Sequence, residues 1–278
     1  MTNRRSFLAQ STVASMVAAA PIAAEAASNP DMHEIKLGVA SYSLREFQRG
    51  LAIKSLKQLG VTYVNIKEFH LPYILKAEEV VKGRKQFDAA GLKVIGGGTF
   101  SFQKEDDADI RAYFEYAKNA GMPLMVSMPT AKILVKLEKF VKEYDIKVAV
   151  HNHGPEDKNF PSIQDVLPIV KNMDPRVGVC CDIGHESRAG KNVLESLEMA
   201  GPRLLDMHFK DLKDPMGKDS QCDVGEGKLP IVAIFKLLMK MKYSGGVMLE
   251  YEINADNPVA GMAKSLSYAR GVLAGLNG

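Results

Sequence analysis

The stretch KVAVHN, residues 147–152, decides the fold, because its apolar residues 148–150 lead directly into a polar end. Two valines alternate in it with Ala149 and His151, and this period of two predicts a strand with the valines on one face and His151 on the other. A second histidine, His153, follows at the same spacing. Strands that carry functional groups at their carboxyl ends are typical of parallel α/β barrels.

Similar short apolar runs occur eight times after residue 34, and longer amphipathic stretches separate them. DADIRAYFEYAKNAG (107–121) and AKILVKLEKFVKEY (131–144) have apolar residues three and four apart, which predicts helices. Eight strand–helix units predict a (β/α)8 TIM barrel, a single α/β domain, rather than an open doubly wound sheet. The predicted strands are 35–41, 62–67, 92–97, 123–128, 147–152, 177–182, 204–209 and 246–251.

Glycines mark the ends of several predicted helices just before the next strand. We expect left-handed helix caps at Gly60, Gly91, Gly121 and Gly201. No glycine-rich phosphate fingerprint follows the first predicted strand, which disfavours a dinucleotide-binding fold.

Composition and charge restrict the class of partner. The chain has 278 residues, with 46% hydrophobic and 25% charged residues, as in ordinary globular proteins. Its formal net charge is only +3, it has no tryptophan, and no run of Lys and Arg is interleaved with aromatic residues. These features disfavour nucleic acid or a membrane surface as the partner and leave a small molecule.

The first 30 residues differ in composition from the rest. An arginine pair at 4–5 precedes Ser-Phe-Leu, then a small-residue apolar run at 11–24 and Ala-x-Ala cleavage candidates. This pattern predicts a twin-arginine-type signal peptide with a short linker in 1–30, and the barrel in 31–278. The apolar run is too short for a membrane span, and we expect a periplasmic location. Export in the folded state would favour a protein that loads its metal first.

Polar side chains collect at the ends of the last four predicted strands. Alternation predicts that they point toward the barrel axis. They are His151 and His153 on the fifth strand, Asp182 and then His185 on the sixth, Asp206, His208 and Lys210 on the seventh, and Glu250 and Glu252 on the eighth. On the seventh strand, Leu205, Met207 and Phe209 are expected to pack outward.

Burial of such groups without partners is costly, and a divalent cation would remove that cost. We predict His151, Asp182, His208 and Glu250 as ligands of Mn²⁺, Co²⁺, Fe²⁺, Zn²⁺ or Mg²⁺. Taken singly, each has an ordinary alternative: a hydrogen-bonded histidine, a helix cap at Asp182, or a solvated carboxylate. Their occurrence on four consecutive strands favours the metal site.

Five motifs together resemble the xylose isomerase-like sugar phosphate isomerase/epimerase family: HNHGP, CDIGH, HFKD, GEG and LEYE, within 151–252. The resemblance covers the chain after the signal. It implies a metal at the barrel mouth, held by Glu, Asp, His and Glu of strands five to eight. Asp182, His208 and Glu250 match three of these ligands, and His185 matches a substrate contact. His151 replaces a glutamate, which removes one of the two opposed carboxylates that an epimerase would use.

Further residues complete the predicted site. Lys67 lies in NIKEFH (65–70), which is unusually polar for a strand end and has a salt-bridged rim as its alternative. The predicted acid–base and enolate-stabilising residues are His153, His185, Glu250, Lys210 and Lys67. The predicted substrate-binding residues are Glu226, Arg188, Glu252 and His70.

These residues predict a metal-dependent isomerase or epimerase that abstracts a proton next to the metal-bound carbonyl of a sugar or keto-sugar. A lyase or dehydratase that cleaves a keto-sugar or keto-glycoside is the close alternative. A catalytically silent sugar-binding module is a third, disfavoured because such a module needs no metal ligands. The fold also resembles endonucleases of abasic sites, which the low positive charge disfavours.

Overall fold

A computed structural model describes residues 34–278, so the predicted export signal and domain boundary lie outside the described residues. Eight parallel strands close into a barrel in the order β1-β2-β3-β4-β5-β6-β7-β10, and this confirms the predicted TIM barrel. The barrel strands are β1 (Lys36–Ala40), β2 (Tyr63–Ile66), β3 (Lys93–Phe100), β4 (Leu124–Ser127), β5 (Lys147–His151), β6 (Val177–Asp182), β7 (Leu204–Phe209) and β10 (Gly246–Leu249).

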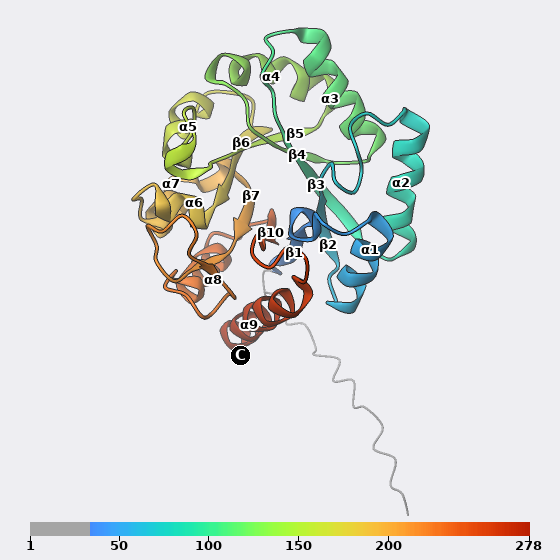
Figure 1. Cartoon of the computed structure of the whole chain (residues 1–278). Coiled ribbons are helices and arrows are strands. Elements are labelled where there is room, and N and C mark those ends of the chain that lie inside the picture. The colour runs from blue at the N-terminus through green and yellow to red at the C-terminus, as the bar shows by residue number, and fades with distance from the viewer. Residues whose placement is uncertain (1–33) are drawn as a thin grey trace, which may run out of the picture. The chain divides into compact units, whose positions relative to one another are not determined.

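Helices surround the barrel and cover its outer face (Figure 1). Within the described residues, none of them is both long and apolar enough to cross a membrane. The helices are α1 (Arg49–Gln58), α2 (Ala77–Ala89), α3 (Asp107–Asn119), α4 (Ala131–Tyr144), α5 (Ile163–Val170), α6 (Ile183–Arg188), α7 (Val193–Ala200), α8 (Ile231–Lys240) and α9 (Val259–Asn277), with 3-10 turns η1 (Ser41–Leu44), η2 (Gly154–Glu156) and η3 (Gly201–Arg203).

The connection after β7 contains a small two-stranded antiparallel sheet of β8 (Asp211–Leu212) and β9 (Gln221–Cys222). Asp211 organises it, because its carboxylate accepts hydrogen bonds from the backbone N–H groups of Gly225, Gly227 and Leu229 at 3.0–3.1 Å. The motif HFKD therefore ends in a residue that shapes a loop.

Predicted helix ends and strand bounds agree with the structure, with two differences. Gly60, Gly91 and Gly121 have φ values of 63°, 79° and 60°, as left-handed caps require. Gly201 also ends its helix at positive φ, but its ψ of −125° lies outside the left-handed helical region. Strand β3 continues to Phe100, three residues past its predicted end. Its consecutive glycines have no side chains, so the alternation that predicts a strand is absent there.

Alternation places the predicted side chains toward the barrel axis, with one correction. Ala149 and Cys180 form a small buried cluster inside the barrel, separate from the main core between strands and helices. Leu205 packs against this inner cluster although alternation predicted it outside. A register shift between β6 and β7 pairs Val179 with Leu204 but Cys180 with Asp206, so Leu205 is an extra residue.

Arg203, just before β7, joins the bottom of the barrel to the end of α5. Its guanidinium donates hydrogen bonds to the backbone carbonyls of Lys171, Met173, Asp174 and Val177 at 2.6–3.0 Å. A single side chain thus donates to four backbone carbonyl groups around the turn before β6.

We expect Arg203→Met to lower the free energy of unfolding by about 3 kcal/mol, because carbonyl groups lose charge-assisted hydrogen bonds. Urea unfolding followed by circular dichroism measures this. The control is Arg111→Met, which removes a half-exposed ion pair with Glu143 and should lower the stability much less than Arg203→Met. Equal losses in the two variants would contradict the role assigned to Arg203.

Candidate functional site

The four predicted metal ligands converge at the carboxyl ends of β5, β6, β7 and β10. The Nε2 atom of His151 lies 2.9 Å from Nδ1 of His208 and 3.8 Å from Oδ2 of Asp182. Nδ1 of His208 lies 3.3 Å from Oε1 of Glu250. One donor atom from each of the four residues lies within 4.8 Å of the others, and all four residues are buried. The structure therefore brings the predicted ligand set together.

This donor set fits a divalent cation. Two imidazole nitrogens point toward each other and toward two carboxylates in a buried space, and Oδ2 of Asp182 has no hydrogen-bond partner there. Two nitrogen and two oxygen donors suit Zn²⁺, Mn²⁺, Co²⁺ or Fe²⁺ better than Mg²⁺, which prefers oxygen ligands. His151, Asp182, His208 and Glu250 would hold the ion.

The protonation states of two of the four ligands, His151 and Glu250, suit a cation, whereas the pKa values of His208 and Asp182 are raised toward their protonated forms. Burial and the neighbouring His153 lower the pKa of His151 well below its usual value, so its ring is neutral and keeps a lone pair. Burial alone would raise the pKa of Glu250, but His208 and Lys210 hold it well below the usual range. A neutral imidazole and an ionised carboxylate are the forms that bind metal.

Lys210 lies among the carboxylates of this cluster. Its ammonium group is 3.0 Å from Oδ2 of Asp182, 3.0 Å from Oε2 of Glu250 and 3.1 Å from Oε1 of Glu252. Although burial lowers the pKa of Lys210, these carboxylates raise it well above its ordinary value. Lys210, predicted to stabilise an enolate, is buried, pairs with these carboxylates and does not line the pocket that opens beside this cluster.

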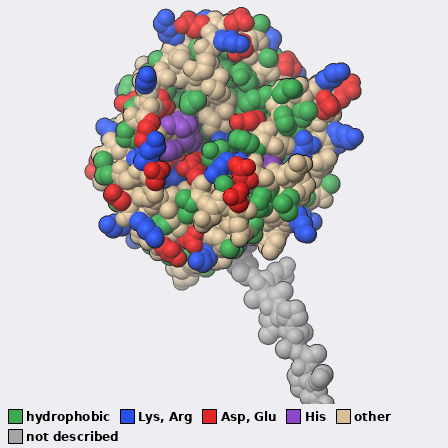
Figure 2. All heavy atoms as spheres, in the orientation of Figure 1, with side chains coloured by type: hydrophobic (Ala, Val, Ile, Leu, Met, Phe, Trp, Pro, Cys, Tyr) green, Lys and Arg blue, Asp and Glu red, His purple; other side chains and the backbone are tan. Residues whose placement is uncertain are grey.

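A pocket of about 230 Å³ opens beside the ligand cluster. Histidine side chains gather in a hollow on this face of the barrel (Figure 2). The lining residues are Tyr42, Lys67, Glu68, Phe69, Thr99, His151, His153, His185, Glu250 and Glu252. This volume is below the roughly 300–1,000 Å³ of drug-sized ligand sites, so the pocket suits a small molecule.

His153 and His185 line the pocket side by side, with ring centroids 5.7 Å apart. Nδ1 of His153 lies 3.4 Å from Oδ2 of Asp157, an electrostatic contact without hydrogen-bond geometry. Nδ1 of His185 accepts a hydrogen bond from the Arg188 guanidinium at 3.1 Å. His185 therefore carries its hydrogen on Nε2.

Burial and the Lys210 ammonium lower the pKa of His185 to about 3, so this ring stays neutral at neutral pH. Arg188 is itself buried and pairs with Glu156. Arg188, predicted to bind substrate, therefore acts on the site through His185.

Lys67 lies across the barrel from His185, because β2 and β6 are opposite one another in the strand order. Its ammonium donates a hydrogen bond to Oγ1 of Thr99 at 2.8 Å and lies 3.7 Å from Oε1 of Glu250. The predicted inward orientation of Lys67 is observed. Glu252, also predicted, reaches the pocket and pairs with Lys210.

Besides Arg188, two more predicted substrate-binding residues do not reach the pocket. The ring of His70 is buried, with Nδ1 2.9 Å from the Ser41 hydroxyl and Nε2 3.0 Å from the backbone carbonyl of Leu44. Both nitrogens are thus used to connect loops. Glu226 lies exposed in the loop after β9, and its Oε1 is 3.9 Å from Nζ of Lys264.

Sequence reasoning missed residues that lack a local motif. Tyr42 and Phe69 form an edge-on aromatic pair with centroids 5.7 Å apart, and both line the pocket. Thr99 contacts Lys67 only through the fold, whereas Asp157 lies four residues after His153. Phe69 is the one aromatic residue of the polar stretch NIKEFH, and its position there could have indicated that it lines the site.

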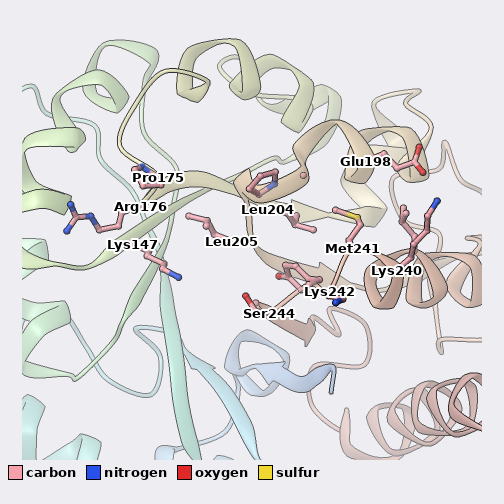
Figure 3. Close-up of a pocket in the computed structure, with 15 residues that line it drawn as sticks. Lys147, Pro175, Arg176, Glu198, Leu204, Leu205, Lys240, Met241, Lys242 and Ser244 are labelled. Atoms are coloured by element: carbon pink, nitrogen blue, oxygen red, sulfur yellow. The ribbon is translucent and has the colours of Figure 1, made fainter. Parts of the chain in front are cut away.

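A larger cavity, of about 720 Å³, lies at the opposite end of the barrel (Figure 3). Its apolar lining includes Leu205 and Met241, and its polar lining consists mainly of exposed lysines and of Arg176, which pairs with Asp174. Among the residues that line this cavity, no buried side-chain nitrogen or oxygen lacks a hydrogen-bond partner. The clustered histidines and carboxylates place the chemistry at the smaller pocket.

A closed α/β barrel with buried histidines and carboxylates at the carboxyl ends of its strands defines a TIM barrel with a candidate metal centre. The chain belongs to the xylose isomerase-like TIM barrel family, whose model matches residues 53–271.

Individual relatives are more distant. An inosose dehydratase of Mesomycoplasma hyopneumoniae is 24% identical over 162 residues, which cover 51% of this chain and 53% of the relative. The chain thus matches about half the length of this curated relative. A zinc-bound IolI protein matches with a TM-score of 0.69 at 20% identity, over 87% of this chain and 98% of that one. A D-psicose 3-epimerase with D-fructose matches with a TM-score of 0.67 at 17% identity, over 88% and 100%.

Proposed function

We propose that this chain is a metal-dependent enzyme that removes a proton next to the carbonyl of a keto-sugar or inosose and then expels the β-hydroxyl as water. The observation that carries this proposal is the pair His153 and His185 beside the ligand cluster, with the Asp157 carboxylate 3.4 Å from His153 and the tautomer of His185 set by Arg188. It supplies one base and one hydrogen-bond donor on the same side of a small pocket.

His153 acts as the base in this proposal. Its Nε2 takes the proton from the carbon next to the carbonyl, and Asp157 stabilises the imidazolium that forms. The C–O bond at the β carbon then breaks, and His153 returns the proton to the departing hydroxide. The products are an unsaturated ketone and water, and His153 is neutral again.

The other polar residues position the substrate. The Nε2–H of His185 donates to a substrate hydroxyl, and the Lys67 ammonium lies where negative charge can be stabilised. Tyr42 and Phe69 offer apolar faces to the ring of a sugar or cyclitol. A divalent cation bound by the four ligands would polarise the carbonyl and acidify the adjacent C–H bond.

Two comparisons support parts of this proposal. The curated relative is named as an inosose dehydratase, and the IolI structure contains zinc. Together with the donor set, they favour a dehydratase that uses a divalent metal.

Isomerisation or epimerisation is the second candidate, and the position of Lys67 favours it. Lys67 faces the pocket from the side opposite His185 and is a group that can return a proton from the other face of the substrate. Glu250 is a poor second base, because His208 and Lys210 hold its pKa well below the usual range.

Incubation of the metal-loaded protein with inososes and keto-sugars in deuterated water tests the proposal. Dehydration gives a product that has lost one water and absorbs in the ultraviolet as an unsaturated ketone. Isomerisation gives a product with the carbon-bound deuterium and no loss of water. Turnover that gives only the second product would reject dehydration, and no turnover of any compound would count against both reactions.

A further inference from the structure

Asn152 lies between the two site histidines of the motif HNHG, but its side chain points toward β6. Its Oδ1 accepts a hydrogen bond from the backbone N–H of Asp182 at 2.8 Å. Its Nδ2 donates to the backbone carbonyl of Asp182 at 3.2 Å. The amide group of Asn152 thus holds both polar backbone groups of a proposed metal ligand, as a neighbouring strand would.

Glu186 orients this amide. The Nδ2 of Asn152 donates to Oε2 of Glu186 at 3.0 Å, which distinguishes the amide nitrogen from the amide oxygen. Oε2 also accepts the backbone N–H of Ile163 at 3.0 Å, and Oε1 accepts the hydroxyls of Ser162 at 2.7 Å and Ser196 at 2.6 Å. A fully buried carboxylate with four donors has one available orientation.

The hydrogen bonds of Glu186 and Asn152 are connected to the proposed metal ligands through Asp182. Asp182 offers Oδ1 to the backbone N–H of His185 at 2.8 Å, so only Oδ2 remains for the cluster. A shift of the Asp182 backbone would therefore move a proposed ligand atom and also the start of α6, which carries His185. The same amide restrains the end of β5 between His151 and His153.

We infer that Asn152 and Glu186 are positioning residues which set the separation of the β5 and β6 ends and thereby the geometry of the metal centre. The inference rests on the metal centre proposed above. Neither side chain lines the pocket, so their effect passes through Asp182 and the histidines. A merely structural role would change the stability of the protein without changing the cation affinity of the folded protein.

Co²⁺ binding to the folded protein tests the inference, because the visible absorption of bound Co²⁺ reports its ligand geometry. Asn152→Asp keeps an acceptor for the Asp182 N–H but removes the donor and sets a second carboxylate against Glu186. We expect the Co²⁺ dissociation constant to rise about 10- to 100-fold, with an altered visible spectrum. The control is Asn172→Asp, which makes the same charge change at an exposed position and should leave binding unchanged.

Glu186→Gln keeps an oxygen for the two N–H donors, and its amide can donate to the serine hydroxyls. We expect this variant to fold and to bind Co²⁺ within about threefold of the unmodified protein, since the orientation of Asn152 is preserved. In the double variant the carboxylate at 152 no longer faces another carboxylate. It should bind Co²⁺ at least about threefold more tightly than Asn152→Asp alone.

The outcomes separate the two proposals. If the unmodified protein binds no Co²⁺, the metal centre itself is rejected. If it binds Co²⁺ and folded Asn152→Asp binds equally well with the same spectrum, the positioning role is rejected while the metal centre stands. If the double variant binds no better than Asn152→Asp, Asn152 and Glu186 do not act as a pair.

Discussion

Replacement of Asp182 by alanine should abolish stoichiometric metal binding and lower turnover on the order of a thousandfold, a loss of several kcal/mol of transition-state stabilisation. Oδ2 of Asp182 is one of four donors to the proposed cation. Without this carboxylate, the cation would have three donors, and the positive charge of Lys210 would lose one of its partners. Metal analysis of the purified protein and the rate of ketone turnover measure the two losses.

Asp182→Ala also removes a helix cap, so a control must separate the two effects. Asp106 caps α3 by accepting the backbone N–H groups of Ala108 and Asp109, and it is exposed and remote from the cluster. Asp106→Ala should cost about 1 kcal/mol of stability and leave metal content unchanged. Retention of metal and activity in folded Asp182→Ala would show that the ligand set is wrong.

His153→Gln should lower turnover about 100- to 10,000-fold while metal binding stays close to that of the unmodified protein. Glutamine has similar size but no basic nitrogen, so it can fill the space beside Asp157 without accepting a proton. Turnover of the Co²⁺-loaded variant, measured with its Co²⁺ dissociation constant, distinguishes loss of the base from loss of the metal.

Two related variants sharpen this result. Asp157→Asn keeps a hydrogen-bonding group near Nδ1 but removes the charge that stabilises the imidazolium, so a smaller loss than in His153→Gln is expected. His70→Gln alters a buried histidine outside the pocket and should affect stability more than turnover. Full activity in His153→Gln would transfer the role of base to another residue.

Strand periodicity was sufficient to predict the barrel and the four converging donors, because both depend on local spacing. His151, Asp182, His208 and Glu250 each follow the alternation of their own strand, and parallel strands bring their carboxyl ends to one face. Leu205 was misplaced because a register shift belongs to a pair of strands and leaves no trace in one strand alone.

Hydrogen-bond partners across the fold were not predictable in the same way. His70 sits in a stretch as polar as a site, yet its partners Ser41 and Leu44 lie 26 or more residues earlier in the chain. Arg188 and Asp157 contact His185 and His153, which lie only three and four residues away along the chain, so these two contacts were within reach of local spacing. A polar residue type alone does not tell a substrate contact from a residue that orients one.

The ammonium of Lys210 between three carboxylates has a consequence for the protein before any ion is bound. An internal cation offsets the mutual repulsion of the acidic groups, so the binding geometry can persist in the metal-free chain. Metal ions then bind and exchange at a centre that is already assembled, and the chain folds without a bound metal ion. Such a protein would acquire its metal as a late event, whichever compartment provides it.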